Sequence, residues 1–127
     1  MKHISFFGLV VLTLSACSSP KKQMIKEVVK LEAQVNKKFT EDNATKLIIE
    51  YDKFITAFPE DTSRKGYMVK AAEVSILKQD PDNALKFINL FLKHYPDDSR
   101  APELQFKKAI VYDLLLNDGI RDRKSVV

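Results

Sequence analysis

The sequence of 127 residues predicts an all-α protein, and three observations support this prediction. In the stretch 80–100, apolar side chains recur at the spacing of one helix face, at Ala84, Ile88, Phe91 and Tyr95. The same pattern occurs 37 residues earlier, at Leu47, Tyr51, Phe54 and Phe58, which makes it an internal repeat. The chain has only three glycines and five prolines, and the prolines lie between the periodic segments. Together these features favour antiparallel helix pairs, repeated along the chain.

The repeated helix has clear start and stop signals in the sequence. Asp80 and Pro81 are typical of a helix N-terminus, because an Asp side chain caps free N–H groups and a Pro fits the first turn. Pro96 ends the helix, since the residue before a proline is pushed out of the α region. The earlier copy has the same stop at Pro59. The sequence therefore predicts helices over 43–58 and 81–94.

Three further helices are predicted around this pair, over about 24–38, 63–78 and 99–117. The last two also match at the offset of 37, with Val69, Lys70 and Ala72 equivalent to Phe106, Lys107 and Ala109. We expect Ala72 to let the following helix approach closely and to pack against Ala84. The aromatic residues at helical spacing are expected to be repeat core rather than a ligand box: Tyr51, Phe54, Phe58, Phe87, Phe91, Tyr95 and Phe106.

The first sixteen residues have the composition of a secretory signal peptide rather than of a folded element. A charged residue, Lys2, precedes the apolar stretch 4–14, and the small residues Ser15 and Ala16 follow it. Eleven helical residues rise about 16 Å, which is too short for a bilayer core of about 30 Å. We expect residues 1–16 to be removed and 17–23 to form a polar tether.

The four residues Leu14-Ser15-Ala16-Cys17 resemble the lipobox of bacterial lipoproteins. This resemblance implies cleavage before Cys17, a diacylglyceryl thioether on its sulfur and acylation of its new amino group. Several acyl chains would anchor the protein firmly, whereas one is marginal. Ser18, where an Asp would signal inner-membrane retention, implies the outer membrane, and the absence of a following acidic run implies a periplasmic face. The alternative is an ordinary signal peptide followed by an unmodified Cys17, the chain's only cysteine.

The helix–turn–helix unit with a small residue at Ala72 and the Ala84, Ile88, Phe91 and Pro96 pattern resembles tetratricopeptide repeats. The resemblance covers about 24–117 and is closer in the second unit, because Leu47 stands where a small residue is usual. With its lipoprotein signal, the chain is similar to a family that contains the lipoprotein subunit of the β-barrel assembly machinery. The resemblance implies a short right-handed solenoid whose concave side, lined by the first helix of each unit, binds other proteins. The residues expected there are Val69, Glu73, Phe106 and Ile110, with internal packing as the alternative.

Catalysis, metal binding and nucleic-acid binding have little support in the sequence. His94, the only histidine after the signal, is expected at a helix C-terminus, where a cation is favoured. The paired carboxylates Glu60-Asp61 and Asp97-Asp98 follow helix-ending prolines and are expected to act as caps. The net charge of +4 is spread along the chain, and the densest basic run, formed by Lys21, Lys22, Lys26 and Lys30, is expected to be a solvated linker and helix face. We expect no enzyme activity, cofactor, metal or nucleic acid.

The expected function is therefore that of a lipid-anchored cell-envelope scaffold that binds other proteins, in outer-membrane protein assembly. Two alternatives remain open at this point: an envelope protein that binds peptidoglycan or spaces other domains, and a carrier of a small ligand.

The chain's last residues predict that its third unit is incomplete. A turn is expected at Asn117-Asp118-Gly119, and the helix that should follow is missing, which leaves the apolar face from Ile110 to Leu116 exposed. Residues 122–127 are also what a widely used sequencing-adapter sequence encodes, so we expect 119–127 to be an artefactual tail without a defined fold. The alternative is a short basic tail.

Overall fold

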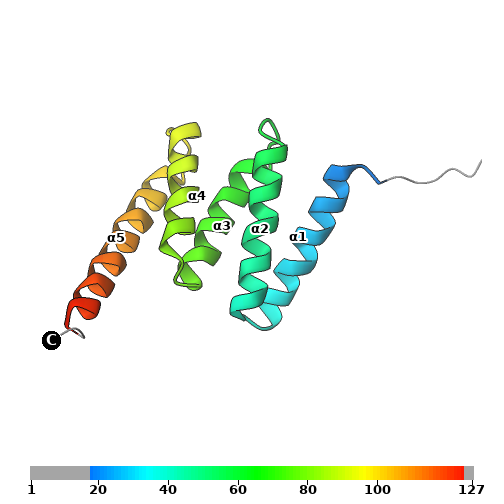
Figure 1. Ribbon diagram of the computed structural model, residues 1–127. Helices are drawn as coiled ribbons and strands as arrows, with labels where there is room; N and C mark the ends of the chain where they lie inside the picture. The colour runs from blue at the N-terminus through cyan, green and yellow to red at the C-terminus, as the bar shows by residue number, and fades with distance from the viewer. Residues whose placement is uncertain (1–17, 125–127) are drawn as a thin grey trace, which may run out of the picture.

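The computed structural model describes residues 18–124, which form five α-helices and no strand (Figure 1). The all-α prediction is therefore confirmed. The helices are α1 (Pro20–Lys37), α2 (Glu41–Ala57), α3 (Arg64–Leu77), α4 (Pro81–His94) and α5 (Ala101–Lys124). None of them is both long and apolar enough to cross a membrane.

Side-chain caps start three of the helices where the sequence places Ser, Thr or Asp. The Thr40 hydroxyl and the Asp80 carboxylate each accept a hydrogen bond from the backbone N–H three residues later, both at 3.1 Å. Ser19 does the same for α1 with the N–H of Lys22, at 3.4 Å. Each cap satisfies one of the four N–H groups that a helix start leaves without a partner.

The two units have the same connections between their helices. α2 ends before Pro59 and α4 before Pro96, and six residues, 58–63 and 95–100, lead to the next helix in each case. Three residues join α1 to α2 and α3 to α4. In the second of these turns Gln79 has a φ of 59°, which closes the end of α3 in the left-handed region. Consecutive helices consequently run antiparallel (Figure 1).

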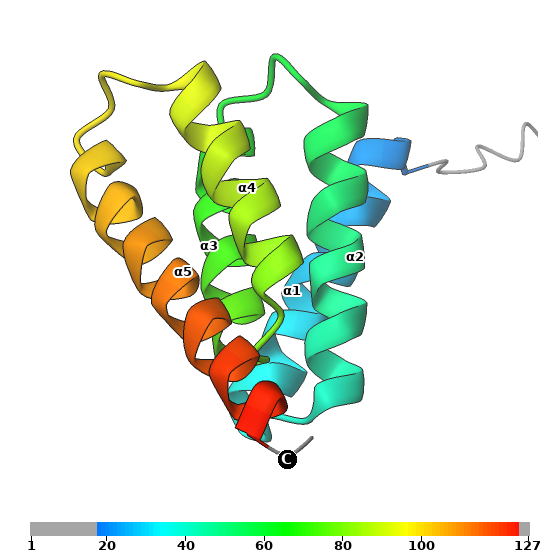
Figure 2. The same ribbon diagram turned by 60° about the vertical axis from the view of Figure 1, so that its left-hand side comes forward.

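The helices lie in two layers. α1 packs on α2, α2 on α3, α3 on α4 and α4 on α5. Ion pairs also connect alternate helices: Glu32 of α1 with Lys70 of α3, and Asp52 of α2 with Lys86 of α4. Figure 2 shows α2 and α4 in front of α1 and α3. The odd-numbered helices thus form one layer and the even-numbered helices the other.

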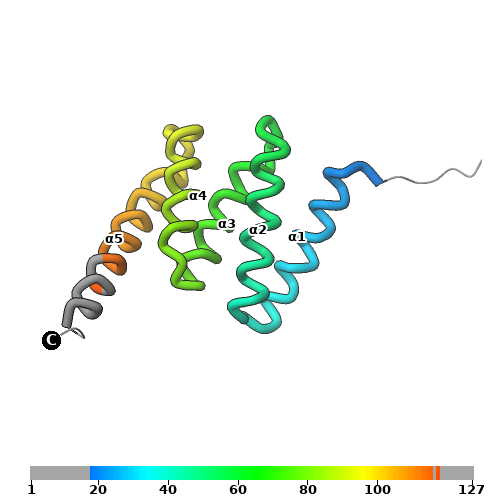
Figure 3. The backbone as a smooth tube through the Cα atoms, viewed as in Figure 1, coloured from blue at the N-terminus to red at the C-terminus, as the bar shows by residue number. Residues whose placement is uncertain are grey.

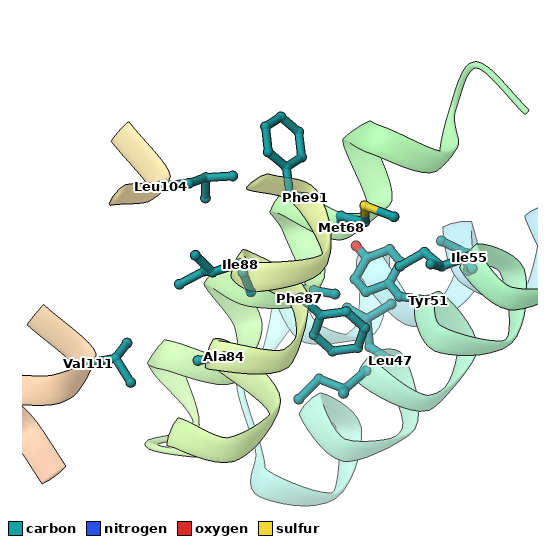
Figure 4. Packing of buried hydrophobic residues seen from close by; sticks show 14 of the residues in the cluster. Leu47, Tyr51, Ile55, Met68, Ala84, Phe87, Ile88, Phe91, Leu104 and Val111 are labelled. Atoms are coloured by element: carbon teal, nitrogen blue, oxygen red, sulfur yellow. The ribbon is translucent and has the colours of Figure 1, made fainter. Parts of the chain in front are cut away.

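The core runs between these layers along the array (Figure 4). Ala84, Ile88 and Phe91 are completely buried, as the helical spacing predicts, and so are Ala72 and Phe87. Most of the predicted core aromatics are buried or half-buried. Phe106 is the exception: it is 67% exposed, so its assignment to the core is wrong.

Two predicted boundaries differ from the structure. α1 begins at Pro20 rather than near residue 24, because Ser19 caps it and Pro20 fits its first turn, so most of the predicted tether 17–23 is helical. α5 continues through 117–119 to Lys124, so the predicted turn is absent and part of the predicted tail, 119–124, is helical. One glycine inside a helix costs only about 1 kcal/mol, which α5 tolerates. The predicted signal peptide, Cys17 and residues 125–127 lie outside the described residues. Figure 3 traces the same path of the chain as a tube.

Candidate protein-binding surface

The four residues predicted to bind a partner lie on α3 and α5 but do not form one patch. Val69 is half-buried and packs against the core, so internal packing is its main role. Glu73 pairs with Lys107, and Ile110, one turn further along α5, is 39% exposed. At 100° per residue, Phe106 points almost opposite to the buried Leu104, away from the core. Of the four residues, Glu73 is the one that contacts the neighbouring odd-numbered helix, through Lys107.

A network of ion pairs connects the three odd-numbered helices on this side of the molecule. The Glu32 carboxylate accepts hydrogen bonds from Lys70 Nζ at 2.8 Å and from the Tyr51 hydroxyl at 2.7 Å. Lys107 Nζ donates to Glu73 at 2.6 Å and also pairs with Glu103 at 2.7 Å. Lys70 and Lys107 are equivalent in the repeat, so the same lysine position links each odd-numbered helix to the one before it.

The pKa values of these groups follow from their partners. Burial works to raise the pKa of Glu32, but hydrogen bonds from Lys70 and Tyr51 outweigh it and hold the pKa below 4.5. Burial and the neighbouring Glu32 carboxylate both raise the pKa of Tyr51. Burial works to lower the pKa of Lys107, yet its bonds to Glu103 and Glu73 raise it above 10.5. Near neutral pH Glu32 and Lys107 are therefore charged, and Tyr51 is a neutral donor.

A groove of about 280 Å³ opens between α1 and α3, with α2 as its floor. Its walls carry the Glu32–Lys70 ion pair and Glu73, and its other side chains are mainly apolar. The lining residues are Glu32, Val35, Asn36, Leu47, Tyr51, Lys70, Glu73, Val74 and Leu77.

A second groove, of about 350 Å³, opens between the α3–α4 turn and α5. It is lined by Ile76, Leu77, Gln79, Asp80, Pro81, Ala84, Val111, Leu114 and Leu115. Leu77 lines both grooves and is 67% exposed, so it forms a ridge between them. Its repeat equivalent Leu114 is 45% exposed. The two grooves, with Leu77 between them, are called the odd-helix face below.

The sequence reasoning did not single out Leu77, although a signal for it was present. Leu77 and Leu114 match at the offset of 37 at the end of the periodic stretch, as Lys70 and Lys107 do. Each leucine follows its lysine by seven residues, or two helical turns, and therefore lies on the same side of its helix. A leucine that repeats on the same side as a repeated lysine indicates a repeated surface feature. Helical spacing alone does not distinguish Leu77 from the core leucines, because it does not say which side of a helix its neighbours cover.

The other predicted roles concern turns and caps. His94 is exposed in the last turn of α4, as predicted. Asp61 and Asp98 accept hydrogen bonds from backbone N–H groups two residues later, Asp61 at 2.8 Å and Asp98 at 3.1 Å, so they brace turns rather than cap helix N-termini directly. Asp61 also pairs with Lys21 of α1, and Asp98 with Lys65 of α3. Bonds from Arg100 hold the pKa of Asp98 far below its usual value. The roles of Asp61 and Asp98 are therefore structural: they hold the turns and pair with lysines of α1 and α3.

No model of a protein family, no curated protein and no solved structure matches this chain. The features of this chain that point to a function are the odd-helix face and the N-terminal sequence.

Proposed function

We propose that this protein is a lipid-anchored scaffold of the bacterial cell envelope that binds a segment of another protein along its odd-helix face. The observation that carries the proposal is the pair of adjacent grooves that share the exposed Leu77. An exposed apolar ridge between two mainly apolar grooves, the first of which carries Glu32, Lys70 and Glu73, favours a protein partner. Apolar side chains of the partner would fill the grooves, and its polar groups would meet the charged residues of the first groove.

The proposed fold is a tetratricopeptide-like solenoid. In both units the aromatic ring five residues before the helix-ending proline packs at a tilt against the ring directly before that proline, Phe54 with Phe58 at 5.0 Å and Phe91 with Tyr95 at 5.4 Å between ring centres. The matching loop lengths of the two units support the same reading. In such an array the first helices of successive units share one side, which here carries the grooves.

The proposed anchor is the acylated Cys17, and the proposed location is the periplasmic side of the outer membrane. The lipobox-like Leu14-Ser15-Ala16-Cys17 supports the anchor, and Ser18 supports the outer membrane. The role in outer-membrane protein assembly depends on the resemblance to repeat-containing lipoproteins.

Site-specific photocrosslinking in intact envelopes tests the proposal. A photoreactive side chain in place of Leu77 is expected to form an adduct with one discrete protein, whereas the same probe in place of the exposed Asn89 on α4 is not. A second change, Leu114→Lys, should abolish the Leu77 adduct because it places an ammonium group in the second groove. Leu114 is 45% exposed, so the variant should still fold, which circular dichroism checks.

Equal adducts at Leu77 and Asn89 would contradict the odd-helix face as the binding site. Adducts with glycan alone would instead support the peptidoglycan-binding alternative.

A small-ligand carrier is the second candidate, because the larger groove of about 350 Å³ falls within the range of small-molecule pockets. Native mass spectrometry of protein taken from envelopes distinguishes the two. A retained small molecule that Leu114→Lys releases supports the carrier, and bare protein supports the scaffold.

A further inference from the structure

The outer side of α1 carries a row of lysines that no packing interaction explains. Lys22, Lys26, Lys30 and Lys37 are all exposed. At 100° per residue they fall within about a quarter of the helix circumference, on the side opposite the buried Val28 and Leu31. The exposed Val29, at 56%, and Ala33 lie among them. These six outward residues are called the lysine face: Lys22, Lys26, Val29, Lys30, Ala33 and Lys37.

The lysine face is positive because α1 carries more lysines than glutamates. α1 contains five lysines and two glutamates, a net charge of +3, whereas α2 contains four acidic residues and two lysines, a net charge of −2. Glu32 is turned inward to Tyr51 and Lys70. Glu27 borders the face and pairs with Lys30 at 3.1 Å, but both side chains are well exposed, so this pair is weak.

The position of α1 places this charge next to the proposed anchor. Because α1 begins at Pro20, only Ser18 and Ser19 separate it from Cys17. Three steps along an extended chain span about 10 Å, which is about one Debye length at moderate salt. α1 also lies at one end of the array (Figure 1), so no other helix of residues 18–124 covers its outer side. The polar tether over 17–23 that the sequence predicted would have let α1 lie further from the anchor and turn more freely relative to it.

We propose that the lysine face binds anionic phospholipid headgroups, with α1 lying along the membrane surface. The proposal rests on the acylation of Cys17 in the proposed function. The ammonium groups meet headgroup phosphates, and Val29 reaches the boundary of the apolar layer. From Lys22 to Lys37 the face extends about 22 Å at 1.5 Å per residue, so a helix lying flat brings all four lysines to the lipid.

This orientation leaves the odd-helix face free for a partner. The residues of α1 that line the first groove are Glu32, Val35 and Asn36, and none of them belongs to the lysine face. Docking of α1 therefore directs the rest of the array away from the bilayer with both grooves open. The anchor and the lysine face together fix the direction in which the scaffold presents its grooves.

Lysine acetylation of the full acylated chain in vesicles tests this proposal. The vesicles contain phosphatidylethanolamine with about one third phosphatidylglycerol, or phosphatidylcholine alone. We expect Lys22, Lys26, Lys30 and Lys37 to react about fivefold more slowly in the anionic vesicles, the factor that corresponds to about 1 kcal/mol per lysine. Lys46 and Lys53 on α2 are the matched controls, since their side chains are 59% and 54% exposed against 60% for Lys30. High salt should remove the protection.

A pair of variants separates lipid contact from a general effect of charge. Lys22→Gln/Lys26→Gln/Lys37→Gln should abolish the protection of Lys30, whereas Lys46→Gln/Lys53→Gln/Lys93→Gln, which removes the same charge elsewhere, should keep it. Equal acetylation in both kinds of vesicle would overturn the proposal. Protection of Lys22 and Lys26 but not of Lys37 would overturn the flat orientation. Protection in whole envelopes but not in anionic vesicles would assign the face to an acidic macromolecule instead of lipid.

The mass of the peptide that contains Cys17 shows whether this residue is acylated, so the anchor and the lysine face are tested separately. If Cys17 is unmodified, the anchor fails, and the chain is added to preformed vesicles in the same two compositions. Selective protection there still supports the lysine face, and its absence overturns it.

Discussion

α3 and α5 occupy equivalent places in the repeat, 37 residues apart, but they bury different amounts of their surface. Both bury the side that faces the preceding unit: Tyr67 and Val74 of α3 correspond to Leu104 and Val111 of α5. The second side differs. Met68, Ala71, Ala72 and Ser75 are completely buried in α3. Their equivalents in α5, which are not buried, are Gln105, Lys108, Ala109 and Tyr112.

The difference between these helices shows that neighbours decide which part of the apolar pattern becomes core. α3 packs against both α2 and α4, whereas α5 packs against α4. The residues differ accordingly: α3 has Met68 and Ala71 where α5 has Gln105 and Lys108. Ala109 keeps the small residue of Ala72 on a side that no described helix covers. Three predictions test this contrast, from the largest expected effect to the smallest.

The largest difference is expected at the Met68 and Gln105 pair. Met68→Ala leaves a cavity in a fully buried site and should lower the free energy of unfolding by about 2–5 kcal/mol. Gln105→Ala changes an exposed site and should stay within about 0.5 kcal/mol of wild type. Urea unfolding followed by circular dichroism measures both. If the two variants are equally stable, the helix register proposed for the repeat is wrong.

An intermediate difference is expected when the two equivalent alanines are enlarged. Ala72→Leu should overpack the α3–α4 interface and cost about 1–3 kcal/mol. Ala109→Leu should have little effect on unfolding, because Ala109 is exposed. The same thermal or urea melts compare them. A large cost for Ala109→Leu would mean that something covers this side of α5 in solution, and its dependence on protein concentration would show whether a second copy does so.

The smallest difference concerns the pH dependence of the two lysine bridges. The folded pKa of Glu32 is below 4.5, so its bonds to Lys70 and Tyr51 stabilise the fold above pH 4.5 and are lost as the pH falls through the folded pKa. Glu32→Gln should therefore lower the stability by under about 1 kcal/mol at pH 7, and the difference from wild type should shrink in acid.

Lys107 provides the opposite case on α5. Its folded pKa is above 10.5, so its bridges to Glu73 and Glu103 stabilise the fold below pH 10.5 and are lost as the pH rises through the folded pKa. The loss of unfolding free energy in Lys107→Gln, relative to wild type, should therefore shrink only at alkaline pH. Urea melts across the pH range measure both variants. If the stability loss of Glu32→Gln grows in acid, the lowered pKa of Glu32 is contradicted.

Most helix positions could be predicted from the sequence because their determinants are local. Thr40 and Asp80 cap helices within three residues of themselves, and Pro59 and Pro96 end helices at the residue before them. The missed boundaries arose where local signals compete. Ser19 and Pro20 were assigned to a tether although they form a helix start, and Gly119 was given too much weight as a helix breaker.

The candidate site was predicted only in part. The sequence predicted a binding surface on α3 and α5, but it included Val69, which packs against the core, and did not include the exposed Leu77. Helical spacing fixes the side of a helix on which a residue lies, and it does not fix how much of that side the neighbouring helices cover.

The sequence by itself determined the helices, their 37-residue repeat and the buried positions of Ala84, Ile88 and Phe91, because periodicity and capping act over a few residues. Only the tertiary structure decided which apolar residues stay exposed and which charges meet. Glu32 and Lys70 are 38 residues apart in sequence, and Glu73 and Lys107 are 34 apart. Contacts of this kind depend on how whole helices stack, since a groove exists only between surfaces that folding brings together.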